Sequence, residues 1–350
     1  MAFFPKERKR QMTTYTQYVV QRDDDSYSFD KEEVTIVPCQ KHDVLVKVKA
    51  ISINPIDTKM ALKRRENQPR SVLGWDVSGT IVALGENVTD FEVGDDVFYA
   101  GAVNRSGGNA DYHYVDSRLI ARKPANLSHA EAAALPLTSL TAWESLFERL
   151  RVTENHKTNP SILIIGGAGG VGSVAIPLAK AAGLRVIATA SRPETEAWVK
   201  EKGADAVINH YHSLSQQLAE QQEDLVDYLL CLNHTDQHWE EMSRVIAPQG
   251  RICSIVDNQQ PLDLSLLKPK SATFTWEFMF TRSTYQTHDM AEQGRILEEI
   301  AKRVEQGVLK TTVTEVLNGM NEHNLLKGHQ RVASGKMIGK LVIQNESTNE

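Results

Sequence analysis

Five glycines lie within seven positions of this chain, at a spacing that can hold the phosphates of a dinucleotide. The run reads Ser161-Ile-Leu-Ile-Ile-Gly-Gly-Ala-Gly-Gly-Val-Gly172, with Gly167, Gly169 and Gly172 in the register G-x-G-x-x-G. In such a turn the first glycine permits the tight bend, the second lets backbone approach a pyrophosphate, and the third lets the helix pack closely on the strand. The free N–H groups at the helix start, around Gly170 and Val171, would then face the phosphates.

The segments on either side of this turn supply the context that the spacing needs. An apolar run fit for a buried strand precedes it, and a helix-forming run from Val171 to Ala182 follows. The alternative is an ordinary glycine-rich turn without a ligand. Ser161 to Ala179 also carries no charge and is as long as a membrane-spanning helix. Its glycines and Pro177 favour two shorter elements joined by a turn.

A second chemical signal follows the next predicted strand, Arg185 to Thr189. Ser191 lies nineteen positions after Gly172, close to where an NAD enzyme places an acidic residue on the ribose hydroxyls. Here the position is neutral and Arg192 follows, so a 2′-phosphate could be held by serine and guanidinium donors. This favours NADPH over NADH. The alternative is that Arg192 is a solvated loop residue, and two nearby glutamates weaken the charge argument.

The composition is that of a globular protein long enough for two domains. The chain has 350 residues, 41% of them hydrophobic and 24% charged, with a net charge of −6. The acidic balance argues against nucleic acid or an anionic membrane as a partner. Three scattered cysteines do not make a disulfide framework, and we expect a cytoplasmic protein. Residues 1–12 are charged, lack a signal-like apolar core and predict a disordered extension.

Two regions of different periodicity must position these residues. From Thr16 to about Pro124 the pattern is β-rich and predicts a compact antiparallel barrel, with little helix. After Ser128 helices and strands alternate, which predicts a parallel sheet covered on both faces. The helices and strands expected in this second region are His129–Leu135, Ser139–Leu150, Glu194–Lys202, Ala206–Asn209, Asp224–Cys231, His238–Ile246 and Arg251–Val256. A long helix over Met290–Gln306 and a strand over Lys340–Ile343 complete the chain.

Taken together, these features resemble the medium-chain dehydrogenase/reductase superfamily over roughly residues 13–345. Four strings are similar to its quinone-oxidoreductase-like branch, often labelled zinc-type alcohol dehydrogenase-like: Asn54-Pro-Ile-Asp-Thr-Lys59, Gly74-Trp-Asp-Val-Ser-Gly79, Leu137-Thr-Ser-Leu-Thr-Ala-Trp143 and Gly335-Lys-Met-Ile-Gly-Lys340. The resemblance implies an α/β protein with two domains. A GroES-like β-barrel catalytic domain would take residues 13–134 and 283–350, and a Rossmann NADP-binding domain, a doubly wound parallel sheet, residues 135–282.

The chain departs from the zinc-dependent members of that superfamily. Those members carry a cysteine where this chain has Asn54-Pro55, and a His-Glu pair where it has Trp75-Asp76. A catalytic zinc needs three ligands from cysteine, histidine and carboxylate, so we expect no metal. Two histidine pairs, His210 with His212 and His234 with His238, have spacings that a metal could use. Polar surface residues are the commoner reading of such pairs.

The resemblance also implies which residues form the site. Asn54, Asp57 and Thr138 are the candidate catalytic residues, and Thr141 would lie near the amide or ribose of the cofactor. Asp57 could anchor its loop or relay a proton, and a plain Asx-type cap is equally open. Asn209 and Leu232 would approach the adenosine. Ile255, Phe278 and Phe280 would approach the nicotinamide, and Lys340 would close over the cleft.

A hydride-carrying cofactor performs the difficult step itself, so the protein must bind, orient and exclude water. Quinones and activated alkenes accept hydride without a metal, because conjugation spreads the developing charge. We therefore expect a zinc-independent, NADPH-dependent quinone or enone oxidoreductase acting on a small molecule. Alternatives are a carbonyl or alcohol dehydrogenase and a non-catalytic NADPH-binding sensor. By analogy with relatives, we also expect a homodimer.

Overall fold

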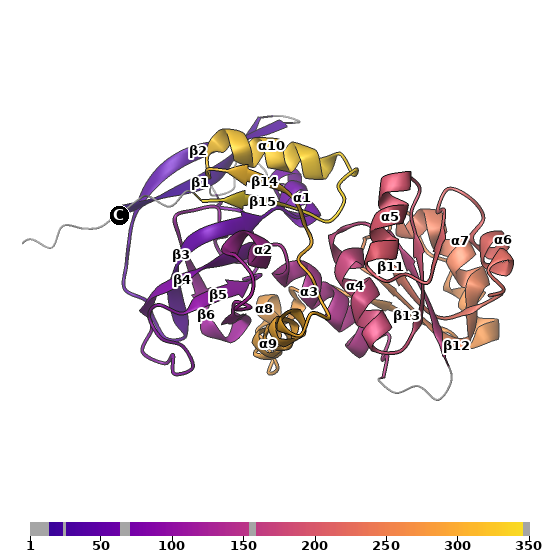
Figure 1. Ribbon diagram of the computed structural model, residues 1–350. Coiled ribbons are helices and arrows are strands. Elements are labelled where there is room, and N and C mark those ends of the chain that lie inside the picture. Colours follow the sequence, from indigo (N-terminus) through magenta and orange to yellow (C-terminus); the bar gives the residue numbers. More distant parts are fainter. Residues whose placement is uncertain (1–13, 24–25, 64–70, 154–158, 346–350) are drawn as a thin grey trace, which may run out of the picture.

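The computed structural model describes residues 14–23, 26–63, 71–153 and 159–345, so the expected extension at 1–12 lies outside the described residues. The chain forms two lobes that lie side by side (Figure 1). The first contains the indigo and purple N-terminal elements together with the yellow C-terminal ones. The second contains the pink and orange elements of the middle of the chain, except that the orange helices α8 and α9 lie with the first lobe. The chain thus leaves the first lobe and returns to it at its end.

The first lobe is built on a seven-stranded sheet in the order β14-β15-β3-β4-β5-β7, with β6 paired to β3. All pairs are antiparallel except β14 with β15. The strands are β3 (Asp43–Ser52), β4 (Asp76–Leu84), β5 (Asp96–Tyr99), β6 (Tyr112–Asp116), β7 (Ile120–Arg122), β14 (Val313–Asn318) and β15 (Lys340–Gln344). The pairing of β15 with β3 places Val342 beside Ser52, although these residues are far apart in sequence.

Other elements cover this sheet. A hairpin of β1 (Thr14–Asp23) and β2 (Ser26–Thr35) lies beside α10, at the top of the lobe in Figure 1. The helices are α1 (Pro55–Lys63), α2 (His129–Ala133), α8 (Thr281–Tyr285), α9 (Glu292–Glu305) and α10 (Glu322–Ala333), with a short turn η1 (Ser117–Leu119). Helix α9 packs its apolar face, which includes Ile296, Leu297 and Ile300, into the core.

The second lobe is a parallel sheet of six strands in the order β10-β9-β8-β11-β12-β13. The strands are β8 (Ser161–Ile165), β9 (Arg185–Thr189), β10 (Ala206–Ile208), β11 (Val226–Cys231), β12 (Ile246–Ser254) and β13 (Thr273–Trp276). Its helices are α4 (Gly170–Ala181), α5 (Pro193–Glu201), α6 (Leu214–Glu220) and α7 (Thr235–Val245), with η3 (Leu264–Lys270). The predicted doubly wound sheet is confirmed.

The uncharged run from Ser161 to Ala179 is divided between β8 and α4, as the glycines predict. Strand β8 is fully buried because sheet neighbours flank it on both sides and helices cover its faces. No helix in the described part of the chain is both long and apolar enough to cross a membrane.

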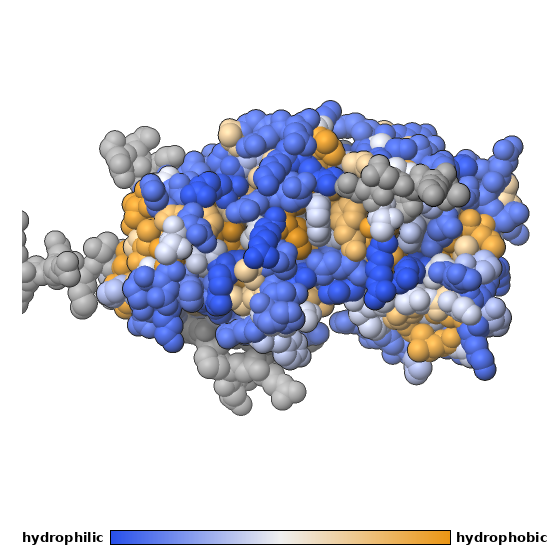
Figure 2. Space-filling model, turned by 90° about the horizontal axis from the view of Figure 1, so that it is seen from below, coloured by the Kyte–Doolittle hydropathy of each residue, from blue (hydrophilic) through white to orange (hydrophobic). Residues whose placement is uncertain are grey.

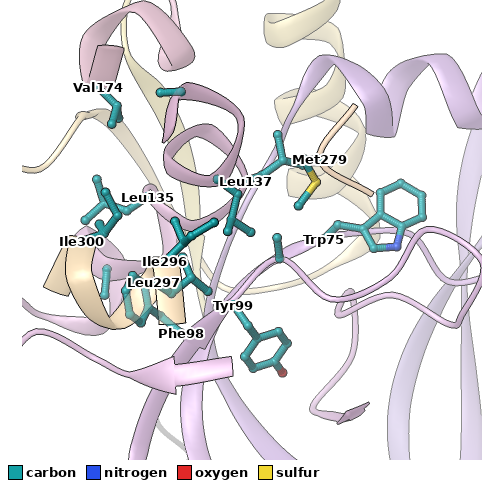
Figure 3. Close-up of a cluster of buried hydrophobic side chains, with 14 of the residues drawn as sticks. Trp75, Phe98, Tyr99, Leu135, Leu137, Val174, Met279, Ile296, Leu297 and Ile300 are labelled. Carbon is teal, nitrogen blue, oxygen red and sulfur yellow. The ribbon is translucent and has the colours of Figure 1, made fainter. Parts of the chain in front are cut away.

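Two helical segments lie between the lobes. Helix α3 (Pro136–Trp143) continues into a π-helical turn, η2 (Glu144–Arg149). Figure 3 shows the side chain of Met279, from the second-lobe side, lying between Leu137 of α3 and Trp75 of the barrel. All three are buried, so the contact between the lobes here is an apolar core rather than a wet interface.

The structure corrects several predicted elements. The single helix expected over 139–150 begins earlier, at Pro136, because proline has no N–H to lose and its fixed φ suits the first helical position. It then changes to π-helical geometry at Glu144. The β-rich region also contains a helix, α1, which was not expected. Its buried residues are Asp57, Thr58 and Ala61, so it has no apolar stripe that would indicate a helix.

Candidate active site

The glycine turn forms a cradle that side chains would fill. Gly166 takes a positive φ of 87° and makes the bend, one position before the glycine predicted to do so. A Cβ on Gly167 would lie 2.9 Å from Cβ of Ala188, and one on Gly172 would lie 2.4 Å from the carbonyl oxygen of Gly167. At Gly169 the nearest atom would be 3.6 Å away. The second glycine therefore leaves open space where a phosphate could approach, and the residues fit a dinucleotide.

A buried ammonium group lies next to this cradle. Lys340 Nζ donates to Asn54 Oδ1 at 2.5 Å, to Asp76 Oδ2 at 2.9 Å and to the Ile53 carbonyl oxygen at 3.3 Å. Lys340 is 4% exposed and Asp76 is 0% exposed. A charge pair so deeply buried is stable only when each partner is fully hydrogen-bonded, and three acceptors satisfy the three ammonium hydrogens.

Asp76 organises this network from the first residue of β4. Its Oδ2 also accepts from Asn54 Nδ2 at 2.8 Å, and its Oδ1 accepts from the Leu137 backbone N–H at 2.7 Å. These bonds fix the Asn54 amide with its oxygen toward Lys340. In the sequence, Asp76 was considered only in relation to zinc binding, and its role in this network was not predicted. The sequence does contain one indication: Asp76 begins an otherwise uncharged strand, and a buried carboxylate requires a cationic partner.

Asp57 holds the loop that carries Asn54. Its Oδ2 accepts from the Asn54 backbone N–H at 2.6 Å, and its Oδ1 accepts from the Gly74 N–H at 3.2 Å. Burial raises the pKa of Asp57 to about 7, although both backbone donors and the Lys340 ammonium act in the opposite direction. The contacts are those of a local cap and anchor.

The raised pKa of Asp57 predicts a pH dependence of stability. Between its unfolded pKa of 3.8 and its folded pKa of about 7, the native state keeps a proton that the unfolded chain has released. Its contribution to the free energy of unfolding therefore falls as the pH rises through this window. We expect urea unfolding of Asp57→Asn to have a flatter pH profile than the wild type over this range. Parallel profiles would show that Asp57 is ionised throughout.

Thr138 and Thr141 lie on α3 with their hydroxyls turned to its backbone. Thr138 Oγ1 donates to the carbonyl oxygens of Leu135 at 3.0 Å and Ala134 at 3.3 Å, and Thr141 Oγ1 donates to that of Leu137 at 2.7 Å. Their oxygens keep acceptor capacity. A Cβ on Gly170 would lie 2.9 Å from Thr138 Cγ2 and 2.8 Å from Lys340 Cδ. The turn, Thr138 and Lys340 therefore meet at one point.

The C-terminal segment places Lys340 at this point. The Gly339 N–H donates to the Ala168 carbonyl oxygen at 2.9 Å, and Gly169 pairs with Gly339 as a parallel bridge. Gly339 needs its positive φ of 55°, and a Cβ there would lie 2.3 Å from the Thr312 carbonyl oxygen. The return of the chain thus docks directly on the glycine turn.

Arg192 lies where this segment meets the second lobe. Its Nη2 donates to the Lys336 carbonyl oxygen at 3.1 Å, and its Nε lies 3.3 Å from Glu194 Oε1. Arg192 and Ser191 follow β9, whose carboxyl end lies at the same sheet edge as the glycine turn. Both are half-buried, which leaves the guanidinium accessible to a ligand.

The other predicted cofactor residues occupy strand ends of the same sheet. Leu232 and Ile255 follow β11 and β12, with backbone N–H groups bonded to the Ile165 and Cys231 carbonyl oxygens. Asn209 follows β10, and its Oδ1 accepts from the Tyr211 N–H. Because the carboxyl ends of parallel strands meet at one edge, these residues face the cradle side of the sheet.

Phe278 and Phe280 follow β13, and they differ in burial. Phe280 is buried and lies edge-on to Trp75, with ring centroids 6.0 Å apart. Phe278 is 48% exposed. Tyr99, which also offers a hydroxyl, is buried in the barrel and bonded to His113 Nδ1 at 3.1 Å. It is a core residue.

The donor set does not fit a zinc ion. Asn54 and Trp75 stand at two of the ligand positions of zinc-dependent members and supply neither thiolate nor imidazole. Asp76, next to Trp75, already pairs with an ammonium group. The described residues contain no group of three or more His, Cys, Asp or Glu side chains that could hold a metal, which includes the four histidines considered above.

Comparisons with known proteins agree with this geometry. The family described as "Alcohol dehydrogenase GroES-like domain" matches residues 40–125, and "Zinc-binding dehydrogenase" matches residues 170–294. A zinc-type alcohol dehydrogenase-like protein of Staphylococcus aureus is 46% identical over 306 residues, covering 87% of this chain and 91% of the relative.

Two solved structures share the whole fold. A protein of Rhizobium etli CFN 42, assigned to the zinc-dependent alcohol dehydrogenases, is 42% identical with a TM-score of 0.90, over 96% of this chain and 99% of the other. A quinone oxidoreductase from Coxiella burnetii is 25% identical with a TM-score of 0.78, over 95% and 100%.

A GroES-like barrel joined to a Rossmann-type parallel sheet with a glycine cradle defines a nicotinamide-dinucleotide-binding oxidoreductase. The 46% identity to the Staphylococcus aureus relative narrows this class further. The chain belongs to the medium-chain dehydrogenase/reductase superfamily, among its zinc-type alcohol dehydrogenase-like proteins.

Proposed function

We propose that this protein is a zinc-independent, NADPH-dependent oxidoreductase that transfers hydride to a quinone or an activated alkene. The observation that carries the proposal is the Lys340 ammonium between Asn54 Oδ1 and Asp76 Oδ2, in the two strings where the resemblance to zinc-dependent members would place a cysteine and a His-Glu pair. A buried ammonium can neutralise Asp76 but cannot bind an alkoxide as a Lewis acid. Acceptors that delocalise charge themselves are therefore favoured over simple alcohols.

The cofactor, when bound, supplies the hydride. The chain's own part is to bind and orient: Gly169 leaves room for the pyrophosphate, and the start of α4 directs N–H groups toward it. Asn54, whose amide is fixed by Asp76, and the acceptor oxygens of Thr138 and Thr141 would position the nicotinamide and the substrate. Apolar packing of Trp75, Leu137 and Met279 excludes water on one side.

Metal-stripped protein should consume NADPH with quinones and enones, and NADH more slowly. The assay compares a panel of quinones, enones and aldehydes with each cofactor, before and after zinc is added. Turnover of quinones or enones without added metal supports the proposal. Activity confined to aldehydes and restored by zinc, or tight NADPH binding without turnover on any acceptor, would reject it.

The choice of NADPH rests on Arg192 and Ser191. Removing the guanidinium removes charge-assisted bonds to a 2′-phosphate, so Arg192→Ala should raise the Kd of NADPH by about tenfold or more. The Kd of NADH should change little, since it has no phosphate at that position. Fluorescence titration with both cofactors measures this. The matched control is Arg185→Ala, at the opposite end of β9, where Arg185 pairs with Glu223. Equal losses for NADPH and NADH would contradict the assignment.

The predicted partners stay part of this proposal: a small-molecule acceptor, no nucleic acid, no membrane, and a second copy of the chain. In the parallel sheet, β13 is one of the two edge strands, with β10 at the other end. Large apolar side chains are exposed on and around it, including Trp276, Phe278 and Tyr285. Figure 2 shows that the face turned to the viewer is largely hydrophilic, with separate apolar patches. An apolar sheet edge supports pairing with another copy.

A further inference from the structure

A cluster of charged side chains, three of them largely buried, lies at the junction of the lobes and has no part in the proposed chemistry. It consists of side chains from four segments: Glu144, Glu148 and Arg149 of η2, Glu277 directly after β13, Arg282 of α8 and Asp289 before α9. The Glu144 side chain is 1% exposed and that of Glu277 is 0% exposed. Charged side chains are almost never buried to this extent unless they are paired.

Each arginine joins separate segments. Arg149 Nε lies 2.7 Å from Glu277 Oε2, which links η2 to the end of β13. Arg282 Nη1 lies 2.9 Å from Glu144 Oε1, and its Nη2 lies 2.9 Å from Glu148 Oε2. Arg282 also pairs with Asp289 at 3.0 Å. The two cations thus face four carboxyl groups.

This imbalance is relieved if one proton stays in the cluster. With all four carboxyl groups ionised, two guanidinium groups would leave two negative charges, and the buried pair Glu144 and Glu277 would repel each other. Both carboxyl groups contact Arg149, with Glu277 Oε2 at 2.7 Å and Glu144 Oε2 at 4.0 Å from its nitrogens, and the buried Glu277 Oε1 accepts no hydrogen bond. A proton kept on one of the two carboxyl groups would supply a donor there. Burial and the neighbouring Glu277 raise the pKa of Glu144 to about 9.

The other groups near the pair do not supply the missing charge. From β12, the Cys253 thiol interacts with Ser145, and burial raises its pKa to about 12, so it is neutral. From α9, the Arg303 guanidinium stacks on Trp143 and pairs with Glu299. The titrating group of the cluster is therefore the carboxyl pair itself.

The pair connects the two sides of the proposed nicotinamide site. Glu144 follows, within one turn, the helix that carries Thr138 and Thr141, and Glu277 immediately precedes the segment that carries Phe278 and Phe280. A π-helical turn is uncommon and occurs frequently at functional sites. Here the turn contains Glu144, whose side chain is 1% exposed and which shares Arg149 with Glu277.

We propose that Glu144 and Glu277 form a proton-sharing clasp that positions α3 against the segment after β13, and so holds both sides of the nicotinamide site in register. The assignment of those sides rests on the function proposed above. When Glu144 loses its proton to solvent, the bond between the carboxyl groups is lost and two carboxylates face each other. The clasp then opens, and turnover falls although the cofactor can still bind.

Glu144→Gln tests the clasp, because an amide can donate to Glu277 as the acid does but cannot ionise. We would measure kcat and KM for NADPH with a quinone acceptor from about pH 7 to about pH 10, where a single ionisation near pH 9 lowers kcat about tenfold. We expect that loss in the wild type, with KM nearly unchanged. Glu144→Gln should keep most of the activity at neutral pH and lose the alkaline decline, whereas Glu144→Leu should be impaired at every pH.

Glu148→Gln is the matched control, since Glu148 lies on the same π-helical turn, also pairs with Arg282 and is partly exposed. It should decline at alkaline pH as the wild type does. The same alkaline decline in Glu144→Gln and wild type would overturn the proposal.

A second readout needs no cofactor. The native state holds the Glu144 proton between the unfolded pKa of 4.5 and the folded pKa of about 9, so the free energy of unfolding should fall as pH rises through this window. Glu144→Gln should remove this part of the slope. If no acceptor is turned over, this profile still decides the clasp: a flatter profile in Glu144→Gln supports it, and equal slopes overturn it.

Discussion

Lys340→Met is expected to lower the free energy of unfolding by about 3 to 5 kcal/mol and to abolish turnover. Methionine matches the length of the lysine stem but leaves the Asp76 carboxylate buried at 0% exposure without a cation. The Asn54 amide also loses the donor that now meets its oxygen at 2.5 Å. Denaturant unfolding gives the stability, and NADPH consumption gives the turnover.

Two further variants distinguish the effect of the Lys340 charge from the effect of its side-chain shape. Adding Asp76→Asn to Lys340→Met removes the unpaired charge, so it should recover part of the stability but not the activity. Lys336→Met, on the exposed part of the same segment, should change stability by no more than about 0.5 kcal/mol. If Lys340→Met unfolds at the same denaturant concentration as the wild type, the contact between Lys340 and Asp76 does not stabilise the native state.

Gly172→Ala and Gly169→Ala should fail in different ways. A Cβ at Gly172 would lie 2.4 Å from the backbone oxygen of Gly167, which cannot move without opening the turn. We expect a loss of about 1 to 3 kcal/mol in stability, with weaker cofactor binding as a consequence. At Gly169 the nearest atom is 3.6 Å away and φ is −74°, so alanine fits the free protein.

Gly169→Ala should instead obstruct the approach of the pyrophosphate. Its unfolding transition should match the wild type, while the Kd of NADPH should rise by about tenfold or more, since phosphate bonds to backbone N–H groups are charge-assisted. Calorimetric titration and denaturant unfolding of both variants measure the contrast. Unchanged NADPH affinity in Gly169→Ala would place the phosphates elsewhere.

The strands and helices of the second lobe were predicted well, because their sequence signals come from residues that are close together in the chain. The strand at Arg185–Thr189 has the predicted bounds, and the glycine turn lies between strand and helix as the spacing requires. Helix α1 was missed because Pro55 to Lys63 lacks an apolar stripe. The change to π-helical geometry at Glu144 could not be foreseen either. Its residues Glu144 and Arg149 pair with Arg282 and Glu277, which lie more than a hundred residues further along the chain.

In the site, too, residues in short sequence strings were predicted, whereas a contact between distant residues was not. Asn54, Thr138 and Lys340 were named from short strings, and the structure brings all three to the glycine turn. Asp76 was overlooked, because its role follows from the ammonium group of Lys340, a contact across 264 positions. The domain boundaries at 134/135 and 282/283, and the roles of the individual site residues, stay predictions.

The first lobe is completed by the last part of the chain, so the site can form only late in synthesis. Asn54 and Lys340 are separated by 286 positions, and β15 supplies the partner strand of β3. At roughly 5 to 20 residues per second, the ribosome needs about 15 to 60 s to add the lysine after the asparagine. During that interval residues 50–52 of β3 lack the partner that β15 provides, although residues 43–47 can pair with β6, and Asp76 lacks its Lys340 partner. A chain that stops before residue 340 therefore lacks both a closed sheet and a completed site, so only the finished polypeptide can become the enzyme.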